Sequence, residues 1–401
     1  MSDVPYTETE MSSFPIQFWI VIVSTFLGFV GIGAIVPVLA PHIKRDLNQS
    51  DVMVGVALGI FSIVALTSRL IAGPVTDSRG RRVGLVSGLA LCSLSGLLYL
   101  LPFGITTILV ARVVQGLGEA FLFVSAAAWA VELSPKDRRA QALGYLGAGV
   151  WGGMAAGPAI GAMLGSFFSA SILLAVSPLP AIWALRYVPD TLERTGQRPT
   201  FAIPRAALMP GIALGLVNIH YPAMSGFLTL HLAQRGASIG GQAFSAYAIM
   251  ILTCRFFLGG LPDRVGPRVT FYTGLAAMAC GLGILSMAPA PWLAVAAAAL
   301  TGFGFSLPWP SIASTVLNRA AEDERASSVG VLTACVDLFV GLASVADGTI
   351  AHRFGYAPLY WLAIAGVGVA ATVGWMVTPK RADVVHHEAG FEDICAVECP
   401  E

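Results

Sequence analysis

Twelve apolar stretches, each about the length of a membrane span, follow one another along the 401 residues of this chain. A helix needs about 20 mostly apolar residues to cross roughly 30 Å of hydrocarbon. Only 11% of the residues are charged, against about 25% in a soluble domain, so water-facing surface is scarce. The sequence therefore predicts an all-α membrane protein of the lipid bilayer with twelve transmembrane helices. The predicted spans lie near residues 16–39, 52–72, 84–102, 106–132, 142–165, 170–187, 207–231, 243–261, 270–288, 291–316, 327–350 and 356–377.

The composition also excludes several classes of protein. Lys and Arg together number 23, as do Asp and Glu, so the chain has no excess of basic residues for binding nucleic acid. The apolar content is too high for a disordered chain, and six cysteines are too few for a disulfide scaffold. The sequence contains no phosphate-binding loop of the G-x-x-x-x-G-K-[ST] type and no cluster of catalytic groups. We therefore expect neither an enzyme nor a cofactor.

The spans fall into two sets of six. Residues 1–188 are predicted to form one six-helix bundle and residues 207–377 a second, with 189–206 as a cytoplasmic linker. Residues 378–401 are predicted to be an acidic, unstructured tail. That tail contains two histidines and two cysteines, His386, His387, Cys395 and Cys399. Their spacing fits no established zinc motif, so we predict no metal site.

Orientation follows from the basic residues, because Lys and Arg are retained on the cytoplasmic side of a membrane. With both termini inside, eighteen of the 23 basic residues lie on the inner side, which includes Arg69, Arg186 and Arg255 at inner helix ends. Four lie on the outer side, and Arg112 lies within a span. The apolar run from Phe14 to Leu39 is too long for a signal-peptide core and has no basic residue before it. We expect an uncleaved first span and cytoplasmic termini.

An internal repeat relates the two halves. One constant offset along the chain, which takes Arg69 to Arg255, also matches glycines, arginines and an aspartate from three separate regions of each half. We call this offset the repeat register. The matched pairs include Arg69 and Arg255, Gly73 and Gly259, Asp77 and Asp263, Gly80 and Gly266, Arg82 and Arg268, Gly116 and Gly302, Gly118 and Gly304, and Arg139 and Arg325. Two parallel six-span repeats with a binding site between them are an architecture of secondary transporters.

The loop between spans two and three carries the sequence GPVTDSRGRR from Gly73 to Arg82, and part of it recurs around Asp263. The simplest interpretation is a turn whose arginines hold the loop in the cytoplasm. The pattern also closely resembles the signature loop of the major facilitator superfamily, and this resemblance extends over about residues 16–377. It implies a conformational latch in which Gly73 lets helix two approach helix eleven, while Asp77 pairs with basic residues such as Arg81 and with a helix end.

Span four places Arg112, Gln115 and Glu119 on one helix face. Charges inside a membrane are costly and usually face a cavity or pathway, although an ion pair that only pins two helices is an alternative. The arginine and glutamine also resemble the superfamily's span-four motif, whose arginine is linked to proton transfer. Span eleven adds Asp337, and we predict Glu119 or Asp337 as the proton-coupling acid, with Arg112 tuning it. Asp347, near the outer end, is expected to be solvated or bonded to a loop.

Span five has glycines at every fourth position, with Pro158 among them. Such a stripe is typical of close helix packing, which is one interpretation. The segment also resembles the antiporter motif of drug and metabolite exporters in the same superfamily, which implies a position at the interface between the halves and favours export. The motif residues are Gly153, Gly157, Pro158 and Gly161.

Two spans contain helix-interrupting residues that can expose polar groups to a cavity. Span seven has Asn218, Tyr221, Pro222 and Ser225, and span ten has two prolines that flank Trp309. We predict that Gln115, Asn218, Tyr221, Ser225 and Trp309 contribute to the substrate pocket.

These features predict a secondary transporter resembling the major facilitator superfamily, with a fold of two parallel six-helix repeats. We expect a monomer of the cell inner membrane that exports a small organic compound, such as a drug, sugar or metabolite, in exchange for protons. The alternative is an uptake carrier for a sugar or organic acid, either coupled to protons or facilitative.

Overall fold

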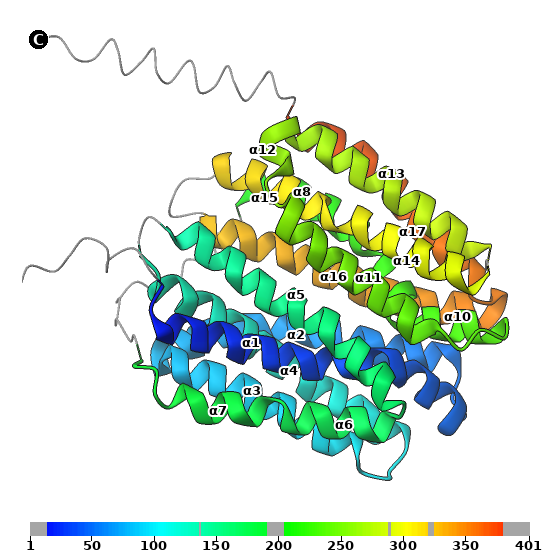
Figure 1. Cartoon of the computed structure of the whole chain (residues 1–401), viewed down its shortest axis with the longest axis horizontal. Helices are drawn as coiled ribbons and strands as arrows, with labels where there is room; N and C mark the ends of the chain where they lie inside the picture. Colours follow the sequence, from blue (N-terminus) through cyan, green and yellow to red (C-terminus); the bar gives the residue numbers. More distant parts are fainter. Residues whose placement is uncertain (1–13, 136–137, 191–203, 288–289, 320–324, 380–401) are drawn as a thin grey trace, which may run out of the picture.

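The computed structural model describes residues 14–135, 138–190, 204–287, 290–319 and 325–379, and every regular element in these ranges is a helix. The long helices lie side by side along the longest axis of the molecule (Figure 1). Residues 191–203 of the predicted linker and 380–401 of the predicted tail fall outside the described ranges, and with them His386, His387, Cys395 and Cys399.

The first six spans form one bundle, in the lower part of Figure 1. Five are single long helices or a helix with a short extension, and the sixth is divided at Ser177. The elements are α1 (Ile16–Pro41) with η2 (His42–Asp46), α2 (Asp51–Arg79), α3 (Arg81–Tyr99), α4 (Ile105–Glu132), α5 (Arg139–Leu164), α6 (Phe167–Val176) and α7 (Pro178–Leu185).

The second six spans form the other bundle, in the upper part of Figure 1. The seventh and tenth spans are interrupted, as the prolines predicted. The elements are α8 (Arg205–Asn218), α9 (His220–Pro222), η4 (Ala223–Phe227), α10 (Leu228–Gln234), α11 (Gly240–Leu258), α12 (Leu261–Val265), α13 (Pro267–Ser286), α14 (Pro291–Ser306), α15 (Pro308–Arg319), α16 (Arg325–Phe354) and α17 (Ala357–Val377).

Eleven helical segments in the described part are long and apolar enough to cross a membrane. The twelfth predicted span is α5, which is helical for 26 residues but is absent from those eleven. Its many glycines lower its mean hydropathy, because a glycine adds no side chain to the apolar surface. The all-α fold with two six-helix repeats is confirmed.

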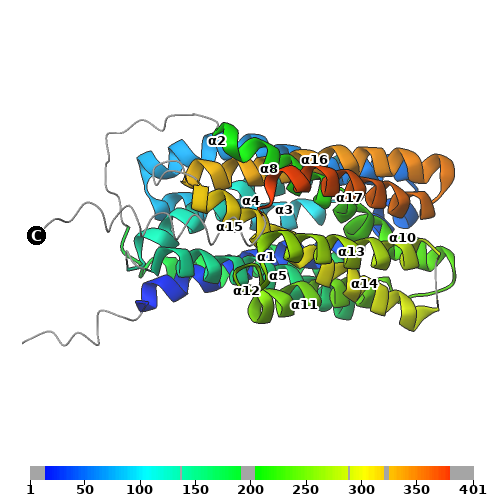
Figure 2. The same ribbon diagram turned by 90° about the horizontal axis from the view of Figure 1, so that it is seen from above.

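Two seams join the bundles. Helix α2 packs against α16, and α5 packs against α11. Figure 2, turned by 90°, separates them, with α2 and α16 on one side and α5 and α11 on the other. The space between the seams is therefore enclosed by helices from both halves.

The repeat extends to backbone conformation and to the contacts of individual residues. Gly80 and Gly266, which match in the repeat register, both have positive φ angles, 106° and 97°, and both precede the third helix of their half. This conformation favours glycine because it has no Cβ. Beside them, Arg82 donates to the carbonyl of Val188 and Arg268 to that of Thr378, so each arginine ties the third helix to the end of the sixth in its own half.

Glycines inside the helices repeat their partners too. A Cβ at Gly116 would lie 2.6 Å from the carbonyl oxygen of Phe61. A Cβ at Gly302 would collide with the carbonyl of Tyr247, the residue that corresponds to Phe61 in the repeat register. Close helix approach at the same place in both halves explains why the sequence repeat retains these glycines.

Helix α2 is longer than predicted. The second span was expected to end near residue 72, but α2 continues to Arg79 with Pro74 inside it. The signature motif therefore begins within a helix, and only Gly80 separates α2 from α3.

Candidate functional site

Two adjoining chambers, of about 160 Å³ and 200 Å³, lie between the two halves. They share one set of walls, contributed by α4, α5, α8 and α16. The shared residues are Glu119, Val150, Trp151, Asn218, Val336 and Asp337. The bundle has a basic end, which carries the turn from α2 to α3 with Arg79, Arg81 and Arg82, and a far end, where α2 begins at Asp51.

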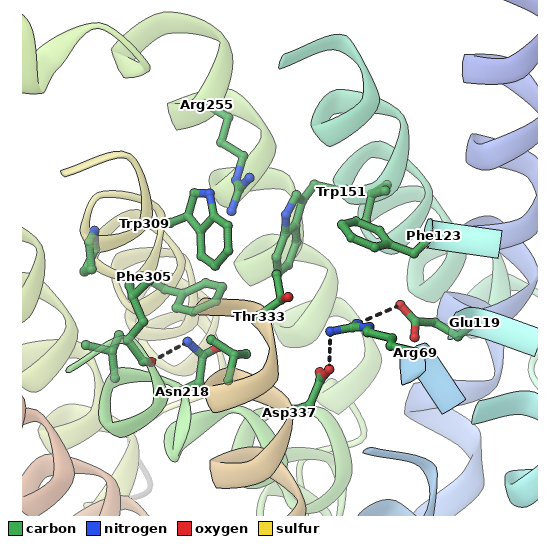
Figure 3. A pocket seen from close by; sticks show the side chains of 15 residues that line it. Arg69, Glu119, Phe123, Trp151, Asn218, Arg255, Phe305, Trp309, Thr333 and Asp337 are labelled. Carbon is green, nitrogen blue, oxygen red and sulfur yellow. Dashed lines mark hydrogen bonds and ion pairs between the residues drawn. The ribbon is translucent and has the colours of Figure 1, made fainter. Parts of the chain in front are cut away.

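A single arginine connects two acids at the centre of the cavity. Arg69 of α2 places Nη1 2.5 Å from Oδ2 of Asp337 and Nη2 3.5 Å from Oε1 of Glu119. Figure 3 shows Arg69 between the two carboxylates. Because Glu119 lies in the first half and Asp337 in the second, the Arg69 bridge joins the two bundles.

The acids are paired only in part. Oε2 of Glu119 is buried and has no hydrogen-bond partner among the described residues. The side chain of Glu119 is 10% exposed and that of Asp337 20% exposed. A carboxyl group in such surroundings can hold a proton in place of an ion-pair partner, because the neutral acid costs less to bury than an unpaired anion.

A second arginine lies across the same chamber. Arg255 of α11 has its guanidinium carbon 4.5 Å from the ring centre of Trp151. In Figure 3 it projects between the rings of Trp309 and Trp151, away from the Arg69 bridge. It forms no ion pair with any acid in the described part of the chain, and its Nε is buried without a hydrogen-bond partner there.

Matching positions of the two halves also line the smaller chamber. In the repeat register, five pairs of positions line the smaller chamber from opposite halves. They are Arg69 and Arg255, Glu119 and Phe305, Trp151 and Asp337, Phe123 and Trp309, and Val150 and Val336. Around Arg69, two positions hold acids. The positions that match them in the repeat register hold aromatic residues beside Arg255.

The partners of Arg112 differ from those expected. Its Nε donates to the carbonyl of Ala57 at 2.9 Å and its Nη1 to Oε1 of Gln115 at 2.8 Å. The hydroxyl of Tyr99 donates to the same oxygen of Gln115. Arg112 reaches the larger chamber, but the arginine that pairs with Glu119 is Arg69. Gln115 is not among the described residues that line either chamber, and its amide oxygen is hydrogen-bonded to Tyr99 and Arg112 inside the first bundle.

The other predicted pocket residues meet in the cavity. Trp309 lines the smaller chamber, Tyr221 and Ser225 line the larger one, and Asn218 lines both. Asn218 donates to the carbonyl of Leu214, one turn earlier in α8. The interruption after α8 thus brings side chains from the α8 end, α9 and η4 to one cavity wall.

The glycine stripe of α5 faces its own bundle. A Cβ at Gly153 would lie 2.7 Å from the carbonyl oxygen of Phe26, and one at Gly157 2.5 Å from that of Val30. Gly161 meets Ala34 in the same way, and Pro158 approaches Gly33. All these partners belong to α1. Helix α5 does lie at the interface, where it contacts α11, but its glycine face packs within the first half.

The signature loop forms an ion-pair cluster at the basic end. Arg81 binds Asp77, and its Nη2 lies 2.7 Å from Oε1 of Glu132. The carboxylate at the N-terminus of α3 belongs to Asp190, whose Oδ1 accepts from the backbone N–H of Arg81 at 2.9 Å. Asp77 lies in the last turn of α2, so it does not occupy that helix-end position. Asp263 lies in α12, and its side chain is outside the described part of the chain.

The seam between α2 and α16 is tight at the far end and open at the basic end. A Cβ at Gly55 would collide with the carbonyl of Ser344, and Gly348 packs on the same part of α2. Asp51 accepts a hydrogen bond from the hydroxyl of Tyr356 at 2.9 Å. A Cβ at Gly73 would meet nothing within 4 Å, so within the described ranges α16 does not pack closely on α2 at this position in this conformation.

The prediction for Asp347 was wrong. Its side chain is 1% exposed, and neither oxygen has a hydrogen-bond partner among the described residues. Asp347 lies in α16, outside both chambers. It is buried because α16 packs against α2 of the first bundle and against α8 and α17 of the second. The described residues contain no group of three or more potential metal ligands.

The sequence interpretation missed two central residues. It counted Arg69 and Arg255 as topological charges at inner helix ends, whereas both line the smaller chamber. Their match in the repeat was a usable signal, because a charge retained at the same helix position in both halves indicates more than loop retention.

Comparison with known proteins supports one family. The family model of the Major Facilitator Superfamily matches residues 21–238 and 206–394. An uncharacterised MFS-type transporter of Salmonella typhimurium is 28% identical over 360 residues, which cover 87% of this chain and 93% of the relative. An uncharacterised MFS-type transporter of Pseudomonas aeruginosa is 26% identical over 372 residues, covering 90% and 92%.

Solved structures agree on the fold. The nucleoside transporter NupG superposes with a TM-score of 0.70 at 11% identity, covering 90% of this chain and 98% of that one. The human organic anion transporter MFSD10 superposes with a TM-score of 0.69 at 14% identity, covering 90% and 100%. At such identities these likenesses concern the fold alone.

Proposed function

The chain belongs to the major facilitator superfamily, and we propose that it is a proton-linked secondary transporter of a small organic compound that works by alternating access. The observation that carries this proposal is the Arg69 bridge between Glu119 and Asp337. It lies inside the cavity, it includes both titratable acids that line the chambers, and it crosses from one bundle to the other.

The bridge offers two pairings for one arginine. A proton on Asp337 leaves Arg69 paired with Glu119, inside the first half. A proton on Glu119 leaves Arg69 paired with Asp337, across the halves. Since Arg69 keeps one anionic partner in either case, a proton can move between the acids without leaving a buried charge unpaired, which would cost about 3 to 5 kcal/mol. Protonation therefore changes whether the halves are joined, and it biases two conformations of similar energy.

In this proposal the basic end lies in the cytoplasm and the protein lies in the bacterial inner membrane. The concentration of Arg79, Arg81 and Arg82 at one end supports this orientation. The open seam at Gly73 and the closed seam at Gly55 then correspond to a conformation that is closed toward the outside. The motif residues Gly73, Asp77 and Arg81 would act when the basic end closes.

We propose export by proton antiport as the first direction. Glu119 and Asp337 line both chambers, so a compound bound there would touch the acids that hold the proton. Competition between compound and proton for the same residues is the coupling that antiport requires. The resemblance of the α5 segment to an antiporter motif supports the same direction, although its glycines pack on α1.

Proton symport, which would accomplish uptake, is the second candidate. The specific observation in its favour is the unneutralised charge of Arg255 in the smaller chamber. A proton on Asp337 adds positive charge to the cavity, and a negatively charged compound at Arg255 would offset it. Mutual support between proton and compound is typical of symport.

Inside-out membrane vesicles with an acidic lumen test both candidates. Their outer face is the cytoplasmic face, and a panel of organic anions, cations and sugars is added there one at a time. Antiport predicts that a transported compound makes the lumen more alkaline, whereas symport predicts further acidification. The variant Glu119→Gln should lose the response. Asp347→Asn, which removes a buried acid outside the chambers, serves as the matched control. Compound entry that never moves protons would contradict the proposal.

A further inference from the structure

Arg255 presents a positive charge to the cavity that no acid in the described part of the chain neutralises. Its Nε is buried without a hydrogen-bond partner among those residues. The guanidinium does stack on Trp151, 4.5 Å from the ring centre, but such a contact contributes only about 0.5 to 2 kcal/mol. An isolated charge in surroundings of low polarity costs considerably more than that.

The acids of the same chamber are already engaged. Glu119 and Asp337 both contact Arg69, on the opposite side of the chamber in Figure 3. Neither acid forms an ion pair with Arg255 in the described part of the chain.

The repeat shows which residues stand beside Arg255 in place of acids. The positions that correspond to Glu119 and Asp337 in the repeat register are occupied by Phe305 and Trp151. Both residues line the chamber beside Arg255. The second arginine therefore has the same place in the fold as Arg69, but aromatic residues stand where Arg69 has acids.

We infer that Arg255 binds the negatively charged group of the transported compound, which is a small organic anion with an aromatic body. This inference rests on the proposed function. The charged group would occupy the place that a protein acid occupies beside Arg69. The body would lie against the aromatic rings of the same chamber, which belong to Phe123, Trp151, Phe305 and Trp309. A chamber of about 160 Å³, which adjoins one of about 200 Å³, suits a compound of one or two rings.

A cationic compound fits this chamber poorly. It would meet Arg255 among the aromatic rings, and it would have to share Glu119 or Asp337 with Arg69. An uncharged sugar would leave the guanidinium unpaired and would place hydroxyl groups against aromatic walls. The anion satisfies both the charge and the apolar surface.

The test is equilibrium binding to the purified full-length protein, measured by isothermal titration calorimetry with three probes of matched shape. They are 1-naphthoate, the neutral 1-naphthamide and the cationic 1-naphthylmethylammonium. We expect 1-naphthoate to bind most tightly. Arg255→Gln should weaken its binding at least about tenfold, the size expected for a lost charge-assisted hydrogen bond, and should leave 1-naphthamide binding within about twofold.

Two further variants separate charge recognition from misfolding. Arg255→Lys keeps the positive charge and should recover part of the 1-naphthoate affinity. Arg264→Gln removes an exposed arginine of α12 and should change nothing. The inference is overturned if the cationic probe binds as tightly as 1-naphthoate, if none of the probes binds, or if Arg255→Gln binds 1-naphthoate like the wild type.

Failure of this inference can be distinguished from failure of the proposed function. Binding at equilibrium requires no proton gradient, so anion binding at Arg255 without proton movement in vesicles would reject the proton linkage alone. Proton movement evoked only by cations or sugars would reject the anion site alone.

Discussion

Arg69 and Arg255 occupy the same place in the two halves of the protein but have opposite surroundings. Each lies on the second helix of its half, the two match in the repeat register, and each lines the smaller chamber. Arg69 contacts two carboxylates, whereas Arg255 stacks on an indole ring. The comparison teaches that the repeated scaffold places two cations in the cavity and that the residues around them differ. Our proposal assigns a proton-linked role to Arg69 and ligand binding to Arg255.

The backbone does not account for this difference. Gly116 and Gly302 approach equivalent carbonyls, and Gly80 and Gly266 adopt equivalent positive φ angles. The helices therefore cross in the same way in both halves. The contrast between the arginines comes from two exchanges in the register, Glu119 for Phe305 and Asp337 for Trp151.

Removal of each arginine gives the largest expected contrast. Arg69→Gln leaves Glu119 and Asp337 facing each other without a cation, which we expect to cost about 3 to 5 kcal/mol and to reduce proton-linked transport at least about 100-fold. Arg255→Gln leaves no acid unpaired, so the thermal stability of the protein should not fall. Thermal unfolding of the two purified variants and vesicle proton movement measure these effects.

Equal unfolding temperatures of Arg69→Gln and Arg255→Gln would contradict the contrast between the two arginines. If Arg255→Gln unfolds at as low a temperature as Arg69→Gln, then Arg255 has an acidic partner or a structural role that its contacts do not reveal. Arg264→Gln controls for loss of a positive charge elsewhere.

Giving Arg255 an acid should make the two sites more alike. Phe305→Glu places a carboxylate at the position that corresponds to Glu119. We expect it to neutralise Arg255 and to weaken 1-naphthoate binding about tenfold or more, because the ligand would compete with an internal anion. Phe305→Gln is the matched neutral variant and should weaken binding less. Calorimetry measures the affinity of both variants for 1-naphthoate. Equal affinities of Phe305→Glu and Phe305→Gln would show that the ligand does not recognise the charge of Arg255.

The scaffold itself should respond equally in both halves, with smaller effects. Gly116→Ala and Gly302→Ala each force a methyl group against a backbone carbonyl, and overpacking of this kind costs about 1 to 3 kcal/mol. We expect similar decreases in Tm for the two variants. Gly73→Ala, at a position with open space around it, should leave Tm unchanged. A large decrease for only one of the first two would mean that the halves do not share their packing.

The sequence was sufficient to predict the spans, the repeat and the interrupted helices of the protein. Apolar length located the spans, the constant offset between matching residues related the halves, and the prolines near Tyr221 and Trp309 predicted interruptions that the structure confirms. These features are local or periodic, so they can be recognised along one dimension.

The arrangement of the site was less accessible. Glu119 and Asp337 could be singled out because acids are rare in spans, but their meeting at Arg69 depends on how α2, α4 and α16 rotate about their axes. Arg69 was assigned to a helix end because the second span was expected to end near residue 72, whereas α2 continues to Arg79 with Pro74 inside it. Asp347 was expected near water because it lies toward the end of its helix, and only tertiary packing buries it.

The central claim is that the charge state of the Arg69 bridge controls how the two halves sit relative to each other. Spin labels at Ser78, at the end of α2, and at Val265, in α12, report on the basic end from opposite halves. Both side chains are exposed, and the six native cysteines would first be replaced. Pulsed electron–electron double resonance then gives the distance distribution between the labels at pH 8 and at pH 5.

We predict that the wild type changes its distance distribution between the two pH values. Asp337→Asn, which imitates the protonated acid, should show the pH 5 distribution at both, while Asp347→Asn should respond like the wild type. A full pH response in Asp337→Asn, or the absence of any response in the wild type, would contradict the claim that this bridge links protons to the movement of the halves.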